Sequence, residues 1–159
     1  MGSMSANSVI RLALTQDAAN IAAMSRAYIE QGLGWSWTEA RVLRAIRDAA
    51  TNVATAQVEG IVLGFGIMQY GDDAAHLSLL AVDPAWRQRG LGAQLVAWLE
   101  QPARVAGIER VRVEARADNP RAIDFYRRHG FREFETIAGY YRGEIDAVRL
   151  EKKLAPGSP

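Results

Sequence analysis

The sequence contains no cysteine, and this absence excludes disulfide bonds, thiolate metal sites and a cysteine nucleophile. It also has no apolar run approaching the roughly 18 residues of a membrane-spanning helix. Neither sign of charge is in excess, because 19 lysines and arginines stand against 18 acidic residues. There is no basic block of the kind that binds nucleic acid, and the start lacks the pattern of a secretion signal. We therefore expect a soluble, cytoplasmic protein that binds neither nucleic acid nor membrane.

A chain of 159 residues is long enough to bury a sizeable core as one domain. Met1-Gly-Ser-Met4 is typical of a cloning remnant, so we expect a tag remnant and disordered start over 1–7. One domain is predicted over 8–154, followed by a disordered tail over 155–159. Both a monomer and a homodimer are compatible with the sequence.

Hydrophobic periodicity predicts an α/β fold, with a mixed sheet and helices on both faces. The second helix is expected to begin at Trp35, after Gly32 and Gly34 end the first helix. A two-residue turn, Glu59-Gly60, separates two strand-like runs and indicates a hairpin. Strands are predicted over 9–14, 52–58, 61–70, 75–82, 108–116, 131–140 and 146–154, and the later helices over 91–99 and 120–129.

The segment Arg87-Gln-Arg-Gly-Leu-Gly92 lies between a predicted strand and a predicted helix. Glycine removes the Cβ atoms that keep a phosphate off the backbone, so the amides of the first helical turn can bind an anion. Two arginines add positive charge beside those amides. The alternative is a glycine-containing loop whose arginines are merely solvated.

Two common phosphate motifs do not fit this segment. A Walker loop is excluded because no Gly-Lys-Ser/Thr is present. The dinucleotide fingerprint fails because its third glycine falls at Leu95, and the acid on the next strand, Glu109, comes too early. An enzyme that uses NAD or ATP is therefore kept only as a competing hypothesis.

The predicted strand 108–116 alternates between apolar and charged residues, so one of its faces looks onto water or a groove. Glu114 is the carboxylate on that charged face, near the carboxyl end of the strand, where ligands bind in open α/β sheets. The alternative is that Glu114 only pairs with Arg112, Arg116 or a cross-strand partner.

The next helix begins at Asn119-Pro120, a strong capping signal, and ends at Gly130. Its expected buried stripe consists of Ala122, Phe125, Tyr126 and His129. Tyr126 is either a buried aromatic residue or, beside a thioester, a candidate acid for a departing thiolate.

Residues 87–92 resemble the acetyl-CoA motif Q/R-x-x-G-x-G/A of the Gcn5-related N-acetyltransferase (GNAT) superfamily. Residues 119–131 resemble its second motif, N-x-x-A-x-x-x-Y-x-x-x-G-F. The resemblance implies a mostly antiparallel sheet of about seven strands, acetyl-CoA as cosubstrate, no metal, and an amine acceptor. It implies cofactor binding by Leu80, Ala81, Val82, Arg87, Gln88, Arg89, Gly90, Leu91, Gly92, Ala93, Asn119 and Tyr126.

A closer resemblance is to bacterial ribosomal-protein alanine N-acetyltransferases. It rests on residues 81–84, 113–116, 119–126, the pair Tyr140-Tyr141 and the run 144–147. That family's base falls on Glu114 and its acid on Tyr126. An inserted Ile145 and a loosely matching segment over 34–37 depart from the pattern where acceptor selection is expected.

Aromatic residues near these departures, Trp35, Trp37, Tyr140 and Tyr141, either rim an acceptor groove or pack at an edge. The two histidines lack metal-ligand spacing, and His76 is a reserve base. A carboxylate relay suits an α-amine, with a reference pKa of about 8, better than a lysine of about 10.4.

The preferred hypothesis is therefore an acetyl-CoA-dependent N-acetyltransferase that works by direct attack on the thioester. A protein N-terminal α-amine is the first acceptor to consider. The alternatives are a small-molecule amine acetyltransferase and a CoA-binding sensor without catalysis.

Overall fold

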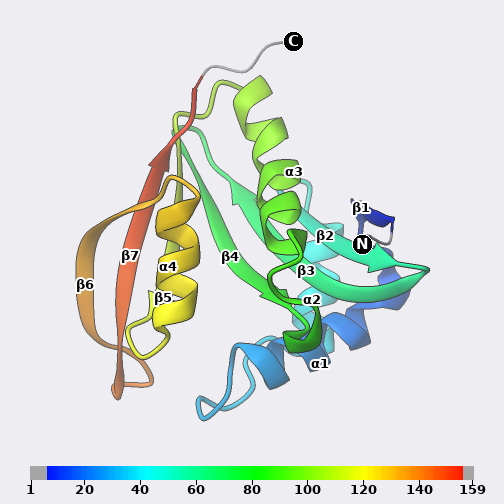
Figure 1. Cartoon of the computed structure of the whole chain (residues 1–159), viewed down its shortest axis with the longest axis horizontal. Helices are drawn as coiled ribbons and strands as arrows, with labels where there is room; N and C mark the ends of the chain where they lie inside the picture. Colours follow the sequence, from blue (N-terminus) through cyan, green and yellow to red (C-terminus); the bar gives the residue numbers. More distant parts are fainter. Residues whose placement is uncertain (1–6, 156–159) are drawn as a thin grey trace. The chain divides into compact units, whose positions relative to one another are not determined.

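A computed structural model describes residues 7–155, so most of the predicted tag remnant and tail lies outside the described residues. Seven strands are hydrogen-bonded in the order β1-β2-β3-β4-β5-β7-β6 (Figure 1). The β4–β5 pair is parallel, and the pairs β1–β2, β2–β3, β5–β7 and β6–β7 are antiparallel. The predicted mixed, mostly antiparallel sheet is confirmed. The strands are β1 Ser8–Leu12, β2 Thr51–Val58, β3 Ile61–Tyr70, β4 Ala74–Val82, β5 Arg110–Arg116, β6 Arg132–Tyr141 and β7 Ile145–Lys153.

The helices also follow the predicted order. They are the short η1 Thr15–Asp17, α1 Ala18–Tyr28, α2 Glu39–Arg47, the short η2 Pro84–Trp86, α3 Leu91–Val105 and α4 Pro120–Arg128. Among residues 7–155, no helix has the length and apolar character needed to cross a membrane.

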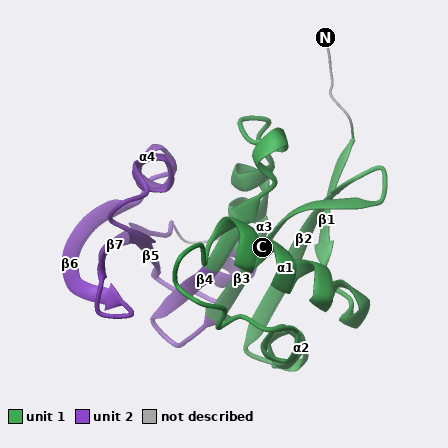
Figure 2. Cartoon of the chain, turned by 90° about the horizontal axis from the view of Figure 1, so that it is seen from below, with its two compact units in different colours: residues 1–69, 79–99 green, residues 70–78, 100–159 purple. Residues whose placement is uncertain are grey.

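Internal contacts divide the chain into two compact units (Figure 2). Unit 1 comprises residues 1–69 and 79–99, and unit 2 comprises residues 70–78 and 100–159. The chain passes from one unit to the other at the end of β3, within β4 and again within α3, so neither unit is continuous in sequence. The single domain over 8–154 stays a prediction.

In unit 1, helices cover both faces of the strands. Residues of α1 and α2 pack on Val53, Phe65 and Ile67 of β2 and β3 in one buried cluster. On the opposite face, a Cβ added at Gly66 of β3 would lie 2.8 Å from Cδ1 of Leu99 in α3. The absence of a side chain at Gly66 therefore lets α3 approach the sheet closely.

The entry to α2 corrects the sequence prediction. The helix begins at Glu39, capped by the Thr38 side chain, rather than at Trp35. The preceding residues are held instead by the buried carboxylate of Glu30, which accepts hydrogen bonds from the amides of Ser36 (2.7 Å) and Trp37. A carboxylate outside the segment thus pairs with these backbone amides and holds the segment in a non-helical conformation.

In unit 2, strand β5 has the predicted two faces. Val111, Val113 and Ala115 are buried, and the charged residues between them are half-buried. The pattern within α4 differs from the prediction, because Ile123 and Tyr126 are its buried residues. Ala122, Phe125 and His129 of the expected stripe are only half-buried.

Candidate functional site

In unit 1, the loop before α3 has the backbone geometry of an anion site. Gln88 and Gly90 both have left-handed backbones, with φ of 64° and 85°. The helix closes its first turn with the amide of Gln94 donating to the carbonyl of Gly90 at 3.0 Å. The amides of residues 91–93 therefore precede the first amide that donates within the helix, and they are available to a ligand. Left-handed residues in such a loop form a concavity of backbone N–H groups, which suits phosphate oxygens.

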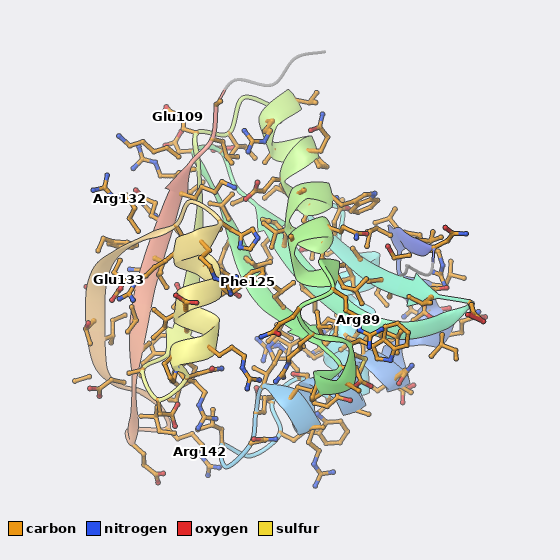
Figure 3. All side chains as sticks on the ribbon, in the orientation of Figure 1. Arg89, Glu109, Phe125, Arg132, Glu133 and Arg142 are labelled. Atoms are coloured by element: carbon orange, nitrogen blue, oxygen red, sulfur yellow. The ribbon has the colours of Figure 1, made fainter. Side chains whose placement is uncertain are left out.

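Positive side chains flank this loop. Arg87 Nε donates to the carbonyl of Val82 at 3.3 Å, which ties the loop to the end of β4. The guanidinium of Arg89 lies 4.6 Å from the ring centroid of Trp86. Arg89 itself lies on the loop that precedes α3 (Figure 3). The carboxylate of Asp83 accepts a hydrogen bond from the amide of Ala85 at 2.9 Å, which fixes the start of the turn. The backbone amides and two arginines fit the diphosphate that the sequence motif predicts.

In unit 2, Glu114 lies in an ion-pair network on the polar face of β5. Its Oε1 is 2.5 Å from Nε2 of His76 on β4, and its Oε2 accepts from Nε of Arg149 on β7 at 3.4 Å. Arg149 also donates to Glu135 of β6 at 2.9 Å. The cross-strand pairing considered as an alternative is therefore present, through Arg149 of β7.

These contacts set the protonation of Glu114. Burial is the largest influence and raises the pKa of Glu114, but hydrogen bonds and charge from His76 and then Arg149 outweigh it, so the pKa lies below its ordinary value. The group is thus a stable carboxylate at neutral pH and a weaker base than a free one. Its side chain is only 11% exposed.

Arg112 belongs to a neighbouring pair on the same face. Its Nε donates to Glu151 of β7 at 2.8 Å, and its guanidinium lies 5.9 Å from the centroid of Phe134. Arg116 is held by Asp118 at 2.9 Å. Both arginines named as possible partners of Glu114 therefore form ion pairs with other carboxylates.

Tyr126 is buried on α4, where its ring packs edge-on against Phe125 and Phe131. Burial, followed by the charges of Tyr141 and Glu114, raises the pKa of Tyr126 well above its ordinary value. A tyrosine hydroxyl, with a reference pKa of about 10, is already a weaker acid than a thiol of about 8.5. Complete proton transfer to a thiolate is therefore uphill, and Tyr126 is suited to donate a hydrogen bond while keeping its proton.

The predicted aromatic residues fall into different environments. Trp37 is 8% exposed and belongs to the core of unit 1, so its ring packs inside rather than rimming a groove. Trp35 is 42% exposed and donates through Nε1 to the carbonyl of Ala22 at 3.2 Å. In unit 2, the rings of Tyr140 and Tyr141 stack edge to face with centroids 5.0 Å apart.

Two further parts of the predicted cofactor site are Asn119 and the end of β4. Asn119 caps α4 by accepting the amide of Ala122 at 3.2 Å. Leu80, Ala81 and Val82 form the end of β4, where the side chain of Ala81 is buried in the core of unit 1.

The most important residue that sequence reasoning underrated is His76. Its partner Glu114 is 38 positions away, and the parallel register that places His76 opposite Arg112 is not encoded in either strand alone. The signal that was available is the alternation of β4, which puts His76 and Ser78 together on its half-buried face.

Comparisons with known proteins agree with this geometry. A family model described as the acetyltransferase (GNAT) family matches residues 14–131. The chain is 37% identical over 87 residues to a ribosomal protein bS18-alanine N-acetyltransferase of Salmonella typhimurium, covering 53% of this chain and 59% of the relative. The chain spans about three fifths of the length of the curated relatives it matches.

Solved structures show the same fold. The structure of Ard1 from Thermoplasma volcanium has a TM-score of 0.83 and 25% identity, with 93% of this chain and 98% of that chain covered. The PaiA N-acetyltransferase of Thermoplasma acidophilum was solved in complex with coenzyme A. It has a TM-score of 0.79 and 18% identity, with 93% of this chain and 99% of that chain covered.

Proposed function

The chain belongs to the acetyltransferase (GNAT) family of acyltransferases, and on that premise we propose that it is an acetyl-CoA-dependent N-acetyltransferase. The acceptor is a primary amine, which attacks the thioester directly. The observation that carries the proposal is the loop before α3, where left-handed Gln88 and Gly90 precede the first-turn amides of α3.

In this proposal, unit 1 binds the cosubstrate through its backbone. The amides of residues 88–93 and the side chains of Arg87 and Arg89 hold the diphosphate. The backbone at the end of β4, residues 80–82, supplies donors and acceptors for the remaining chain of the cosubstrate. When bound, acetyl-CoA supplies an acetyl group activated as a thioester. The PaiA structure, with its bound coenzyme A, supports this choice of ligand.

The polar cluster of unit 2 handles the proton of the acceptor. The amine must lose one proton as its bond to carbon forms, and Glu114 with His76 is the paired acid–base group on the open face of β5. Tyr126 keeps its proton and donates a hydrogen bond toward the departing sulfur.

For the acceptor, we propose a protein N-terminal α-amine. An α-amine has a reference pKa of about 8, so much of it is already neutral near neutral pH, whereas a lysine of about 10.4 needs a stronger base. The lowered pKa of Glu114 makes this carboxylate a weaker base than a free one, which argues against the harder deprotonation of a lysine. The name of the Salmonella relative, a ribosomal protein bS18-alanine N-acetyltransferase, supports the same acceptor class.

The proposal is tested by following thiol release from acetyl-CoA with a panel of amines. Peptides with a free N-terminal alanine or serine are compared with polyamines, amino acids and aminoglycosides. We expect turnover to be fastest with the peptides. Preference for one of the small amines would reassign the acceptor, and the absence of turnover on every amine, with acetyl-CoA binding intact, would favour a sensor.

Calorimetry tests the cosubstrate separately. Acetyl-CoA is expected to bind saturably, and NAD and ATP are not. Tight binding of NAD or ATP in place of acetyl-CoA would contradict the proposal.

A further inference from the structure

We propose that His76 is the side chain that removes the acceptor's proton, with Glu114 as its positioning partner and Ser78 at the other ring nitrogen. This inference rests on the proposed function, because it assigns a role within the same reaction. All three residues lie in unit 2, on β4 and β5.

The contacts of the imidazole determine which of its nitrogens is available. Nε2 lies 2.5 Å from Oε1 of Glu114, and Nδ1 lies 3.3 Å from Oγ of Ser78. An ionised carboxylate only accepts hydrogen bonds, so Nε2 carries the ring proton and donates a hydrogen bond to Glu114. Nδ1 is then the bare nitrogen with a lone pair, and the hydroxyl of Ser78 can donate to it.

Exposure also favours His76 over Glu114 as the group that meets the amine. The side chain of His76 is 41% exposed, whereas that of Glu114 is 11% exposed. Both carboxylate oxygens of Glu114 are already occupied, one by His76 and one by Arg149. An incoming amine therefore finds an accessible imidazole rather than an open carboxylate.

The charges around the pair stabilise the product of this proton transfer. An imidazolium at His76 lies directly against the negative Glu114. Opposing positive charge is limited, because Arg149 is shared with Glu135 and Arg112 is paired with Glu151. The lowered pKa of Glu114 keeps that carboxylate ionised and in place as an orienting group.

The step balances without any further reagent. The amine nitrogen forms a bond to the thioester carbon, the carbon–sulfur bond breaks, and the nitrogen loses one proton. Nδ1 of His76 takes that proton, either directly or by way of the Ser78 hydroxyl, which gives its own proton to Nδ1 as it receives the amine's. Sulfur leaves as a thiolate and is protonated from solvent, to which the imidazolium later returns its proton.

One test needs no turnover. Nitrogen-15 spectra of labelled histidine distinguish protonated from bare ring nitrogens, and the chain has two histidines. In His129→Gln the remaining signals come from His76, and the spectrum is read in the alkaline range where it no longer changes with pH. We expect a protonated Nε2 and a bare Nδ1, with this preference lost on adding Glu114→Ala, which removes the acceptor. A protonated Nδ1 in the first variant would overturn the proposal.

The second test is kinetic. His76→Gln is expected to lower kcat by about 10²- to 10⁴-fold, with the KM for acetyl-CoA unchanged within about twofold. His129→Gln is the matched control, because its imidazole bonds the Phe125 carbonyl at 2.7 Å on α4 and lies outside the network. Added imidazole is expected to restore part of the activity of His76→Gly, which a purely structural role would not produce.

The outcomes separate the two proposals. If the parent releases thiol and His76→Gln retains its kcat, the role of His76 is overturned while the proposed function stands. If the parent releases no thiol with any amine, the proposed function fails, and the role of His76 fails with it.

Discussion

The contacts that hold Glu114 in place also decide what it can do. His76 and Arg149 stabilise its charged form, so Glu114 is a good orienting anion and a weak proton acceptor. A positioning group of this kind matters for the rate through the geometry and charge of its neighbour, as carboxylates that orient a histidine do in other acid–base sites.

Removing the charge of Glu114 should therefore slow the reaction while leaving the cosubstrate site intact. We expect Glu114→Gln to lower kcat by about 10²- to 10⁴-fold, with unchanged acetyl-CoA affinity by calorimetry. Glu151→Gln is the control, since Glu151 carries the same charge on the same face but pairs with Arg112. Equal losses in both variants would show that only the overall charge of the face matters.

A second buried carboxylate, Glu30, has a structural role. Burial is the largest influence and raises the pKa of Glu30, but hydrogen bonds from Ser36, Ser25 and Trp37 outweigh it, so the pKa is lowered. Folding therefore favours the ionised form. The resulting stability is fully present above the pKa of the unfolded chain and is lost as pH falls through the lower pKa of the folded state.

Glu30→Gln is predicted to reduce the free energy of unfolding by about 1–3 kcal/mol at neutral pH, because it weakens hydrogen bonds to a charged acceptor. The gap between parent and variant should shrink on acidification below about pH 4.5, the reference region for this side chain. Urea unfolding at several pH values measures this difference in the free energy of unfolding. Glu59→Gln, on an exposed turn, is the control, and an equal loss there or a gap independent of pH would contradict the assignment.

At the scale of elements, the N-terminus of α3 depends on one backbone conformation. Gly90 has a φ of 85°, and a Cβ at this position would meet no atom closer than 3.7 Å. A substitution is therefore opposed by backbone strain, and not by crowding.

Gly90→Ala is expected to cost about 1–2 kcal/mol of stability and to weaken acetyl-CoA binding, because the strained loop no longer presents its amides. Gly60→Ala is the matched control, since Gly60 has a similar φ of 79° in open space on the β2–β3 turn. Thermal unfolding and calorimetry measure the two effects. Comparable loss of acetyl-CoA binding in both variants would argue against a binding role for the loop.

The elements also show how far sequence reasoning reaches. The two faces of β5 and the Asn119 cap of α4 were predictable, because alternation and capping are local properties of the chain. The start of α2 was not, because Glu30 of another segment holds Ser36 and Trp37 outside the helix.

In the candidate site, too, sequence reasoning found single residues but not their contacts. Glu114 was identified from its own strand, whereas its pairing with His76 depends on the parallel register of β4 and β5. Tyr126 was located by its motif, but the direction of its pKa shift comes from burial that the motif does not specify.

At the scale of the whole molecule, the proposed reaction is divided between two sets of residues. The proposal assigns cosubstrate binding to the loop before α3, in unit 1, and the acceptor's proton to the cluster around Glu114, in unit 2. Family membership supports the acyltransferase chemistry, and the acceptor class rests on the proposal of an N-terminal α-amine.

The most direct test is steady-state thiol release from acetyl-CoA with a peptide bearing a free N-terminal alanine and one internal lysine. The same peptide with a blocked N-terminus is the control. We expect thiol release that saturates in both substrates and disappears when the N-terminus is blocked. Release that persists at the same rate with the blocked peptide would contradict the α-amine acceptor, and release no faster than without peptide would contradict the proposed transfer itself.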